Sequence, residues 1–506
     1  MKSSWSRSAL FGFLSWMLPL GLTLFATPMV VRHLGFEEYG LYALVLGFIS
    51  YSFTISIGRA VTKYVSEYRA SEQTEKIREV LAATLWINFI VGVLGIFTLC
   101  FFARFIVVAL YDIKPEMQEN AVVAFYIASA TIFFVMQAQI FSGVLQAVHR
   151  LDIFSIITTI VSVLGVSGNV VIVLLGFGVK ELLVWNLVNT TSSCIWFYLA
   201  GKRLLPEAKW GIKCSREVLI TVAKFVSGIA ASQLISNFLL LFERGLITRE
   251  LGTENLTYYV IPMNLAGQIH IFSSSLLLML FPLASELGAR LEIERLRAIY
   301  EQTSKYLFAV VSFIVVSMAI CGHEFFSLWL GSEFADKAFY VVIIQAVTFG
   351  TIALGIVAWQ FMEGLGYTQK NALMAIVWVA LSLFLMIIFI SPLKLEGVGL
   401  GRMFGCISVL IYILVVENKI FGKTLWSFWG RVLFLISLPL CLTAALEYVS
   451  LQYLFGGWSG LCIACGSGAM IYVGLLFTTR YLTFDDSLIL RKIFIKVFPQ
   501  LSYLND

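Results

Sequence analysis

Apolar segments of about 20 residues recur along the whole chain and are separated by short polar loops. An α-helix needs about 20 apolar residues to cross the hydrocarbon core of a bilayer, so each segment predicts a transmembrane helix. A transmembrane β-barrel would instead need alternating segments of about ten residues, and the sequence shows no such pattern. We count about fourteen spans, at approximately residues 8–31, 40–58, 80–102, 121–148, 153–175, 182–200, 218–242, 258–281, 306–321, 339–362, 372–390, 397–416, 432–449 and 461–477.

The loop that follows the first span returns after the seventh span. RHLGFEEYGLYAL begins at Arg32, and RELGTENLTYYVI begins 217 residues later, at Arg249. The charged segments that follow spans two and eight also match, at an offset of 219 residues. The chain therefore contains two copies of one pattern. Five of eleven aligned loop positions are identical, namely Arg32 and Arg249, Leu34 and Leu251, Gly35 and Gly252, Glu37 and Glu254, and Tyr42 and Tyr259.

The spacing of the two copies predicts how they are oriented. An even number of spans separates them, so both copies face the same way, as in transporters whose halves are related by an axis along the membrane normal. We expect an all-α polytopic membrane protein with two parallel six-helix lobes, residues 1–200 and 218–416, joined by a cytoplasmic linker at 201–217. Residues 417–506 would add two further transmembrane helices and a cytoplasmic tail.

Composition agrees with a bilayer as the solvent. Hydrophobic residues make up 59% of the 506 positions and charged residues only 13%, whereas a soluble protein carries roughly a quarter charged residues. Most of the eight cysteines lie inside apolar segments, so no extracellular disulfide framework is expected.

The placement of basic residues predicts the orientation. If the N-terminus is cytoplasmic, the inside segments hold 25 of the 35 lysines and arginines and the outside loops hold eight. Cytoplasmic loops are the ones enriched in these residues, so both termini are expected inside a cytoplasmic (inner) membrane. The basic residues sit in short loops between spans, which argues against nucleic-acid binding.

Sequence motifs for catalysis are missing. The chain has no Walker loop and no HExxH, and its outside loops are too short for a separate catalytic domain. We therefore expect no enzymatic activity, no catalytic residues, no cofactor and no metal.

Ionisable residues inside spans are the remaining candidates, because a charge at mid-bilayer costs about 2.5–3.5 kcal/mol on insertion scales and normally faces a cavity. Arg402 lies in GVGLGRMFG, where Gly397, Gly401 and Gly405 form a stripe that allows close helix packing. Arg402 either binds an anion or makes a structural pair with carbonyls or a carboxylate.

Four further basic residues have two interpretations each. His270, near the middle of span eight, either lines a cavity or bonds a neighbouring helix. Lys224 lies near the cytoplasmic end of span seven and either lines a cavity or extends its ammonium to the membrane interface (snorkelling), which is the simpler explanation. Arg59 and Lys63 follow span two and either line a cavity or anchor the helix to lipid phosphates.

The repeated loops carry charges that lie at the outer mouth in this topology. Arg32, Glu37, Arg249 and Glu254, together with Arg244, either form a gate or serve as interfacial anchors beside turns.

These motifs resemble a known family. PMVVRHLGFEEYGLYALV from Pro28, LFPLASEL from Leu280 and EFFSLWLGSEF from Glu324 are similar to the polysaccharide-transporter branch of the multidrug/oligosaccharidyl-lipid/polysaccharide exporter superfamily, which includes the O-antigen flippases. The resemblance implies a twelve-plus-two helix fold around a cationic cavity. It also implies alternating access that flips an undecaprenyl-diphosphate-linked oligosaccharide for surface polysaccharide biosynthesis.

The resemblance also suggests partners and competing functions. Arg59, Lys63, Lys224, His270 and Arg402 become candidate substrate-binding cations, and membrane lipids, polysaccharide assembly proteins and a coupling proton or sodium ion are the implied partners. A multidrug/cation antiporter of the same superfamily is the alternative, although the basic bias argues against it. A membrane-embedded polysaccharide polymerase or glycosyltransferase is a further alternative. It would need a large outside loop with catalytic residues, and the sequence shows none.

Overall fold

The computed structural model describes residues 2–52, 57–206, 211, 213–277, 279–454, 456–483 and 486. Within this part of the chain fifteen α-helices and two π-helical turns account for nearly all residues. Their bounds are α1 Lys2–Tyr51, α2 Gly58–Ala70, α3 Thr74–Phe105, η1 Ile106–Leu110, α4 Pro115–Ala147, α5 Leu151–Leu174, α6 Val179–Leu204, α7 Arg216–Leu251, α8 Thr253–Leu276, α9 Leu280–Ala289, α10 Ile293–Leu330, α11 Ser332–Gly364, α12 Thr368–Gly405, α13 Ile407–Phe421, α14 Trp426–Val449, η3 Ser450–Leu454 and α15 Gly457–Thr478.

The expected fold class, an all-helical multi-pass membrane protein, is confirmed. In the part of the chain that the structure describes, eight helical segments are long and apolar enough to cross a membrane, and the bent pair α8 and α9 makes a ninth. Two of the predicted spans merge in α1, across Gly35, and α12 continues across a kink at Lys394. Phe97 and Phe101 on α3 are 67% and 69% exposed, as expected of side chains that face lipid.

Both repeated loops form the same backbone corner. Gly35 has φ 76° and ψ 165°, and Gly252 has φ 88° and ψ 166°. Such positive φ values favour glycine because it has no Cβ. A third corner of this kind, with φ 102° and ψ 159°, occurs at Gly331 between α10 and α11. In all three a leucine precedes the glycine and a glutamate follows two residues later, where the helix N-terminus favours negative charge.

The charged segments after the second and eighth predicted spans fold as short helices. The sequence predicts loops there, but the structure forms α2 and α9. Apolar residues at helical spacing explain the difference, because Val61 and Val65 on α2 and Leu280 and Leu287 on α9 are buried. The two helices also fall at corresponding places in the two copies of the repeat.

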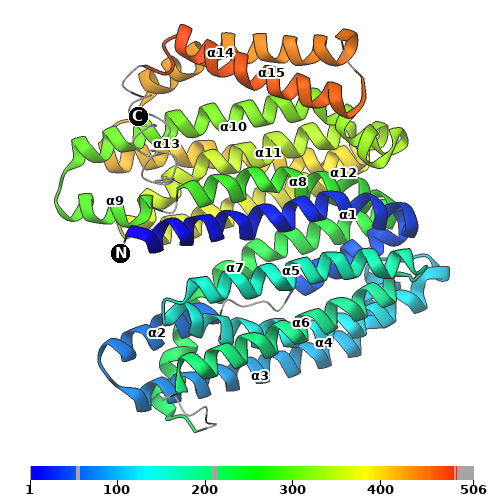
Figure 1. Cartoon of the computed structure of the whole chain (residues 1–506), viewed down its shortest axis with the longest axis vertical. Helices are drawn as coiled ribbons and strands as arrows, with labels where there is room; N and C mark the ends of the chain where they lie inside the picture. Colours follow the sequence, from blue (N-terminus) through cyan, green and yellow to red (C-terminus); the bar gives the residue numbers. More distant parts are fainter. Residues whose placement is uncertain are drawn as a thin grey trace. The chain divides into compact units, whose positions relative to one another are not determined.

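The chain divides into two compact units, residues 1–257 and 258–506. In the first unit α4 lies between α3 and α6 (Figure 1), and α7 contacts α1, α2 and α3. Buried apolar residues of α2, α3, α4 and α7, among them Val65, Leu81, Val144 and Val222, form one core cluster. The six-helix lobes expected from the repeat remain a prediction.

In the second unit α10 and α11 pack along each other, and α11 also contacts α9, α12 and α13. The two C-terminal helices, α14 and α15, pair with each other and lie beside α10 (Figure 1). Ala309 of α10, Ile436 of α14 and Tyr472 of α15 are buried in the cluster that joins these three helices. The added helices are therefore an integral part of this unit.

Candidate functional site

Arg402 is a buried arginine of the second unit. It lies on α12 with only 3% of its surface exposed. Its guanidinium carbon is 4.9 Å from the centroid of the Phe349 ring on α11, and its Nη1 is 3.4 Å from the Met263 sulfur on α8. Three helices therefore hold this cation, and stacking on an aromatic face offsets part of its desolvation.

Close packing within α12 positions Arg402. The helix is broken at Lys394, which has φ 51°, and its last part lies against residues 382–390. A Cβ added at Gly401 would lie 2.5 Å from the Met386 backbone nitrogen. A Cβ added at Gly397 or Gly405 would also collide with residues 382–390, in the part of α12 before the kink. The stripe of glycines packs tightly, as the sequence predicts.

His270 belongs to the same unit as Arg402. It is half-buried on α8, and its Nε2 lies 3.4 Å from the Ser274 hydroxyl one turn further along. Met263, which contacts Arg402, precedes His270 by two turns on this helix. Among the contacts of the described residues none joins the two basic side chains directly.

Three other predicted cations gather in the first unit. Arg59 and Lys63 are exposed one turn apart on α2, and Lys224 is exposed on α7. The Lys63 ammonium is 4.5 Å from the centroid of the Phe225 ring, which brings it to the turn of α7 that carries Lys224. These residues make an exposed basic cluster, defined here as Arg59, Lys63 and Lys224.

The residues predicted for an outer gate all lie in the first unit. Glu37 pairs with Lys114, whose Nζ is 2.7 Å from the Glu37 carboxylate, and this hydrogen bond raises the pKa of Lys114. Arg249 is exposed and its Nε is 3.8 Å from Glu250. Arg32 is exposed and Glu254 is half-buried in the first turn of α8. Lys114, at the start of α4, is the partner that sequence reasoning missed.

The structure corrects the position of Arg244. The sequence predicts that span seven ends at residue 242 and that Arg244 lies at the outer mouth, but α7 continues to Leu251 and Arg244 is only 4% exposed. Its Nη1 donates to the carbonyl of Ala43 on α1, and its guanidinium lies over the Tyr51 ring. Gly47 leaves room for this side chain, since an added Cβ would lie 2.8 Å from Arg244 Cδ.

Glu447 on α14 is a buried carboxylate that sequence reasoning missed. Its side chain is fully buried, and the Ser317 hydroxyl of α10 donates to its Oε1 at 2.7 Å. Gly468 of α15 faces the same carboxylate, because a Cβ there would lie 2.5 Å from Oε1. A lone acidic residue inside the predicted span 432–449 was the available signal.

Comparisons with known proteins agree with the fold and the membrane assignment. A family described as "Polysaccharide biosynthesis protein" matches residues 29–339. A Shigella flexneri protein named "Putative O-antigen transporter" is 18% identical over 373 residues, which cover 72% of this chain and 86% of that protein.

Solved structures of two transport proteins are also similar. The lipid II flippase MurJ, in an inward closed conformation, matches with a TM-score of 0.72 and 13% identity over 92% of this chain and 97% of its own. An inward-facing multidrug resistance MATE family transporter of the MOP superfamily matches with a TM-score of 0.67 and 17% identity, covering 81% of this chain and 98% of its own.

The matched fold is that of an all-helical multi-pass membrane protein. The chain belongs to the polysaccharide biosynthesis protein family, whose profile spans more than half of it. The resemblance expected from the sequence is thereby confirmed.

Proposed function

We propose that the protein translocates a polyprenyl-diphosphate-linked oligosaccharide across the cytoplasmic membrane by alternating access, for surface polysaccharide biosynthesis. The family supports the polysaccharide pathway, and the similarity to MurJ and MATE structures supports a fold that transports substrates. The undecaprenyl carrier, the cytoplasmic termini and a coupling ion belong to the same proposal.

The observation that carries the proposal is the burial of Arg402. A diphosphate is a dense anion, and a guanidinium can bind two of its oxygens at once through parallel N–H groups. Arg402 lies on the membrane helix α12 and contacts α8 and α11. The glycines at 397, 401 and 405 pack the two parts of α12 against each other around it. Keeping a charge at this depth is costly, which is why such residues usually serve a substrate or ion.

The exposed basic cluster of the first unit has a different role in this proposal. Arg59, Lys63 and Lys224 lie on surface turns of α2 and α7, where an anionic headgroup can approach from water. Exposed charges are screened over about 10 Å at 0.1 M salt, so they assist capture more than tight binding. His270 is the remaining cation assigned to the substrate path.

Replacement of Arg402 tests the proposal. In a strain that depends on this protein, Arg402→Ala should reduce surface glycan at least about tenfold, with lipid-linked repeat units accumulating on the cytoplasmic leaflet. Arg402→Lys should restore only part of the export, because lysine keeps the charge but loses the bidentate fork. Arg290→Ala, which removes an exposed arginine paired with Glu286, is the matched control.

Membrane insertion is measured in parallel for every variant. Full export by a correctly inserted Arg402→Ala protein would remove Arg402 from the site. Normal delivery of repeat units to the outer leaflet in a deletion strain, with no second flippase present, would overturn the function itself.

A drug or cation antiporter is the second candidate, and Glu447 is the observation that favours it. Cation export needs buried acidic groups, and Glu447 is fully buried with a hydroxyl as its donor. If this function is correct, Glu447→Gln should raise drug susceptibility and leave surface glycan unchanged. The flippase proposal expects drug susceptibility to stay the same.

A further inference from the structure

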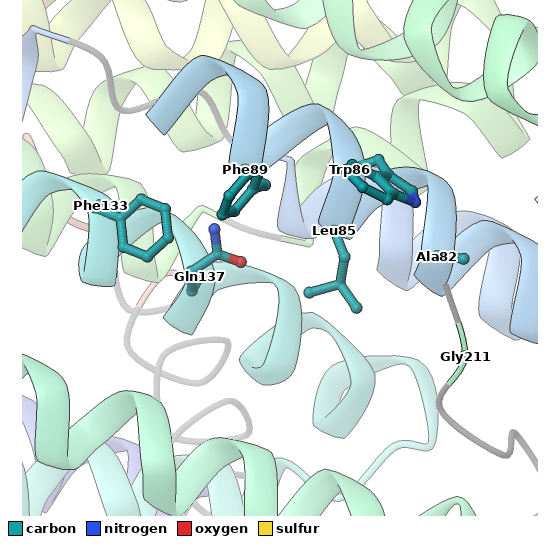
Figure 2. Close-up of a pocket in the computed structure, with 7 residues that line it drawn as sticks. All are labelled: Ala82, Leu85, Trp86, Phe89, Phe133, Gln137 and Gly211. Atoms are coloured by element: carbon teal, nitrogen blue, oxygen red, sulfur yellow. The ribbon is translucent and has the colours of Figure 1, made fainter. Parts of the chain in front are cut away.

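A groove on the first unit is lined by none of the cations assigned to transport. It has a volume of about 320 Å³ and is formed by α3, α4 and residue 211. Figure 2 shows the Gln137 amide beside Phe89, with Phe133 next to it and with Leu85 and Trp86 further along α3 toward Gly211. The walls are therefore apolar and mostly aromatic.

Gln137 is the polar group inside this groove. Its side chain is only 8% exposed, and within the described part of the chain its Nε2 has no hydrogen-bond partner. A buried donor that lacks an acceptor costs about 1–3 kcal/mol. An occupant that offers an oxygen at this point would remove that cost.

Arg78 stands at the Gly211 end of the groove. A Cβ added at Gly211 would lie 2.7 Å from Arg78 Nε and 3.0 Å from its Nη2, so the guanidinium touches the residue that closes the groove. Arg78 precedes the groove residue Ala82 by one helical turn and therefore lies on the same face of α3. Its Nε is buried and makes no hydrogen bond to any described residue.

The groove thus presents a cation at its Gly211 end and, further along, the Gln137 amide of α4 beside aromatic rings. A glycerophospholipid carries matching groups in the same order: an anionic phosphate, an ester carbonyl and an acyl chain. The predicted span of α3 begins near residue 80, so Arg78 would lie at the level of the headgroups and the aromatic walls within the hydrocarbon core. Beyond Phe89 the exposed Ile90, Val93 and Phe97 continue an apolar path for the chain.

We propose that this groove binds one anionic phospholipid of the surrounding bilayer, with its phosphate at Arg78, an ester carbonyl at the Gln137 Nε2 and an acyl chain along the packed rings of Phe89 and Phe133, whose centroids are 6.1 Å apart. Arg402, the proposed substrate cation, is not part of this site. A failed test of the lipid site would therefore leave the transport proposal unaffected, and the reverse also holds.

Native mass spectrometry of the purified full-length protein tests the site with phosphatidylglycerol and phosphatidylcholine as probes. We expect one phosphatidylglycerol to bind about tenfold more tightly than phosphatidylcholine, and Arg78→Ala to abolish this preference. Arg104→Ala, at the far end of α3 and exposed, should keep it. Equal binding of the two lipids to the wild-type protein would overturn the proposal.

A steric pair of variants provides a second readout. Leu85→Trp fills the groove and should remove the tight lipid, whereas Leu94→Trp on the exposed face of the same helix should retain it. Equal lipid retention by the two variants would contradict the site, and matched thermal melting shows that both fold.

Displacement of phosphatidylglycerol by added undecaprenyl diphosphate would also overturn the lipid site, because the groove would then belong to the substrate. If Leu85→Trp does not fold, the comparison of Arg78→Ala with the wild-type protein still tests the site.

Discussion

At the scale of single residues, glycines leave the space in which a charged side chain is buried. Gly401 lets the last part of α12 approach Met386, and the next residue, Arg402, is thereby directed among α8 and α11. Gly47 does the same for Arg244 by leaving space beside α1. A glycine makes room for each arginine, Gly401 in the same helix as Arg402 and Gly47 on α1 beside Arg244.

Substitution of Gly401 gives a prediction at this scale. Gly401→Ala should destabilise the protein by about 1–3 kcal/mol and lower export, because the new Cβ would overlap the Met386 backbone and force the two parts of α12 apart. Gly474→Ala on α15 is the matched control, since nothing lies within 4 Å of its added Cβ. That change should leave the melting temperature equal or slightly higher, as alanine favours a helix by about 0.5–1 kcal/mol. Equal melting temperatures for both variants would contradict the packing argument.

At the scale of elements, short polar contacts attach the C-terminal part to α10. Asp486 accepts from the Lys305 ammonium at 2.7 Å and from the Tyr306 hydroxyl. Burial raises the pKa of Asp486, but the hydrogen bonds from Lys305, the Thr483 backbone and Tyr306 outweigh it and hold this pKa well below its usual range. The ionised carboxylate is therefore the form that the fold stabilises.

The pH dependence of this attachment follows from the sign of the shift. A depressed pKa contributes stability above the unfolded value near 3.9 and loses it as the pH falls further. Hydrogen exchange of residues 479–483 should therefore be slow at pH 7 and, corrected for intrinsic rates, faster below about pH 4. Asp486→Asn should accelerate exchange roughly tenfold or more already at pH 7.

Asp152→Asn is the control for this measurement. It removes a carboxylate whose pKa is also lowered, by a hydrogen bond from Arg150, but which lies in the first unit. Exchange of residues 479–483 should not change in this variant. Similar exchange in Asp486→Asn and wild-type protein would show that the Lys305 pair does not attach the segment.

At the scale of the whole molecule, the repeat and the distribution of basic residues predict the orientation. The Leu-Gly-x-Glu corners at Gly35 and Gly252 have nearly the same backbone angles, so the repeat extends to the local backbone. That the two copies face the same way stays a prediction. The excess of lysine and arginine on alternate connections predicts that the 201–217 segment is inside and the Gly331 corner outside.

Cysteine accessibility tests this orientation. In intact cells a membrane-impermeant maleimide should label Glu333→Cys but not Lys213→Cys, and both should react after permeabilisation. Wild-type protein, with its eight native cysteines, sets the background. The reverse labelling pattern would invert the predicted topology.

Local chemistry determined a large part of this protein from its sequence. The length of the apolar segments specified an all-helical membrane fold, because a bilayer requires spans whose backbone groups bond internally. The glycines at 35 and 252 marked the corners, because positive φ is a property of a single residue. The close packing of Gly397, Gly401 and Gly405 was readable from their spacing alone.

The tertiary structure decided what depends on contacts between distant segments. It buried Arg244 against α1 and Glu447 against α10, gave Glu37 its partner Lys114, and brought Gly211 against Arg78 beside the lipid groove. These pairs are separated by between 77 and 201 residues, and over such separations neither the hydrophobic period nor the composition of the sequence predicts a contact. Side-chain burial and pairing are set by which helices meet, and that is settled only when the helices pack.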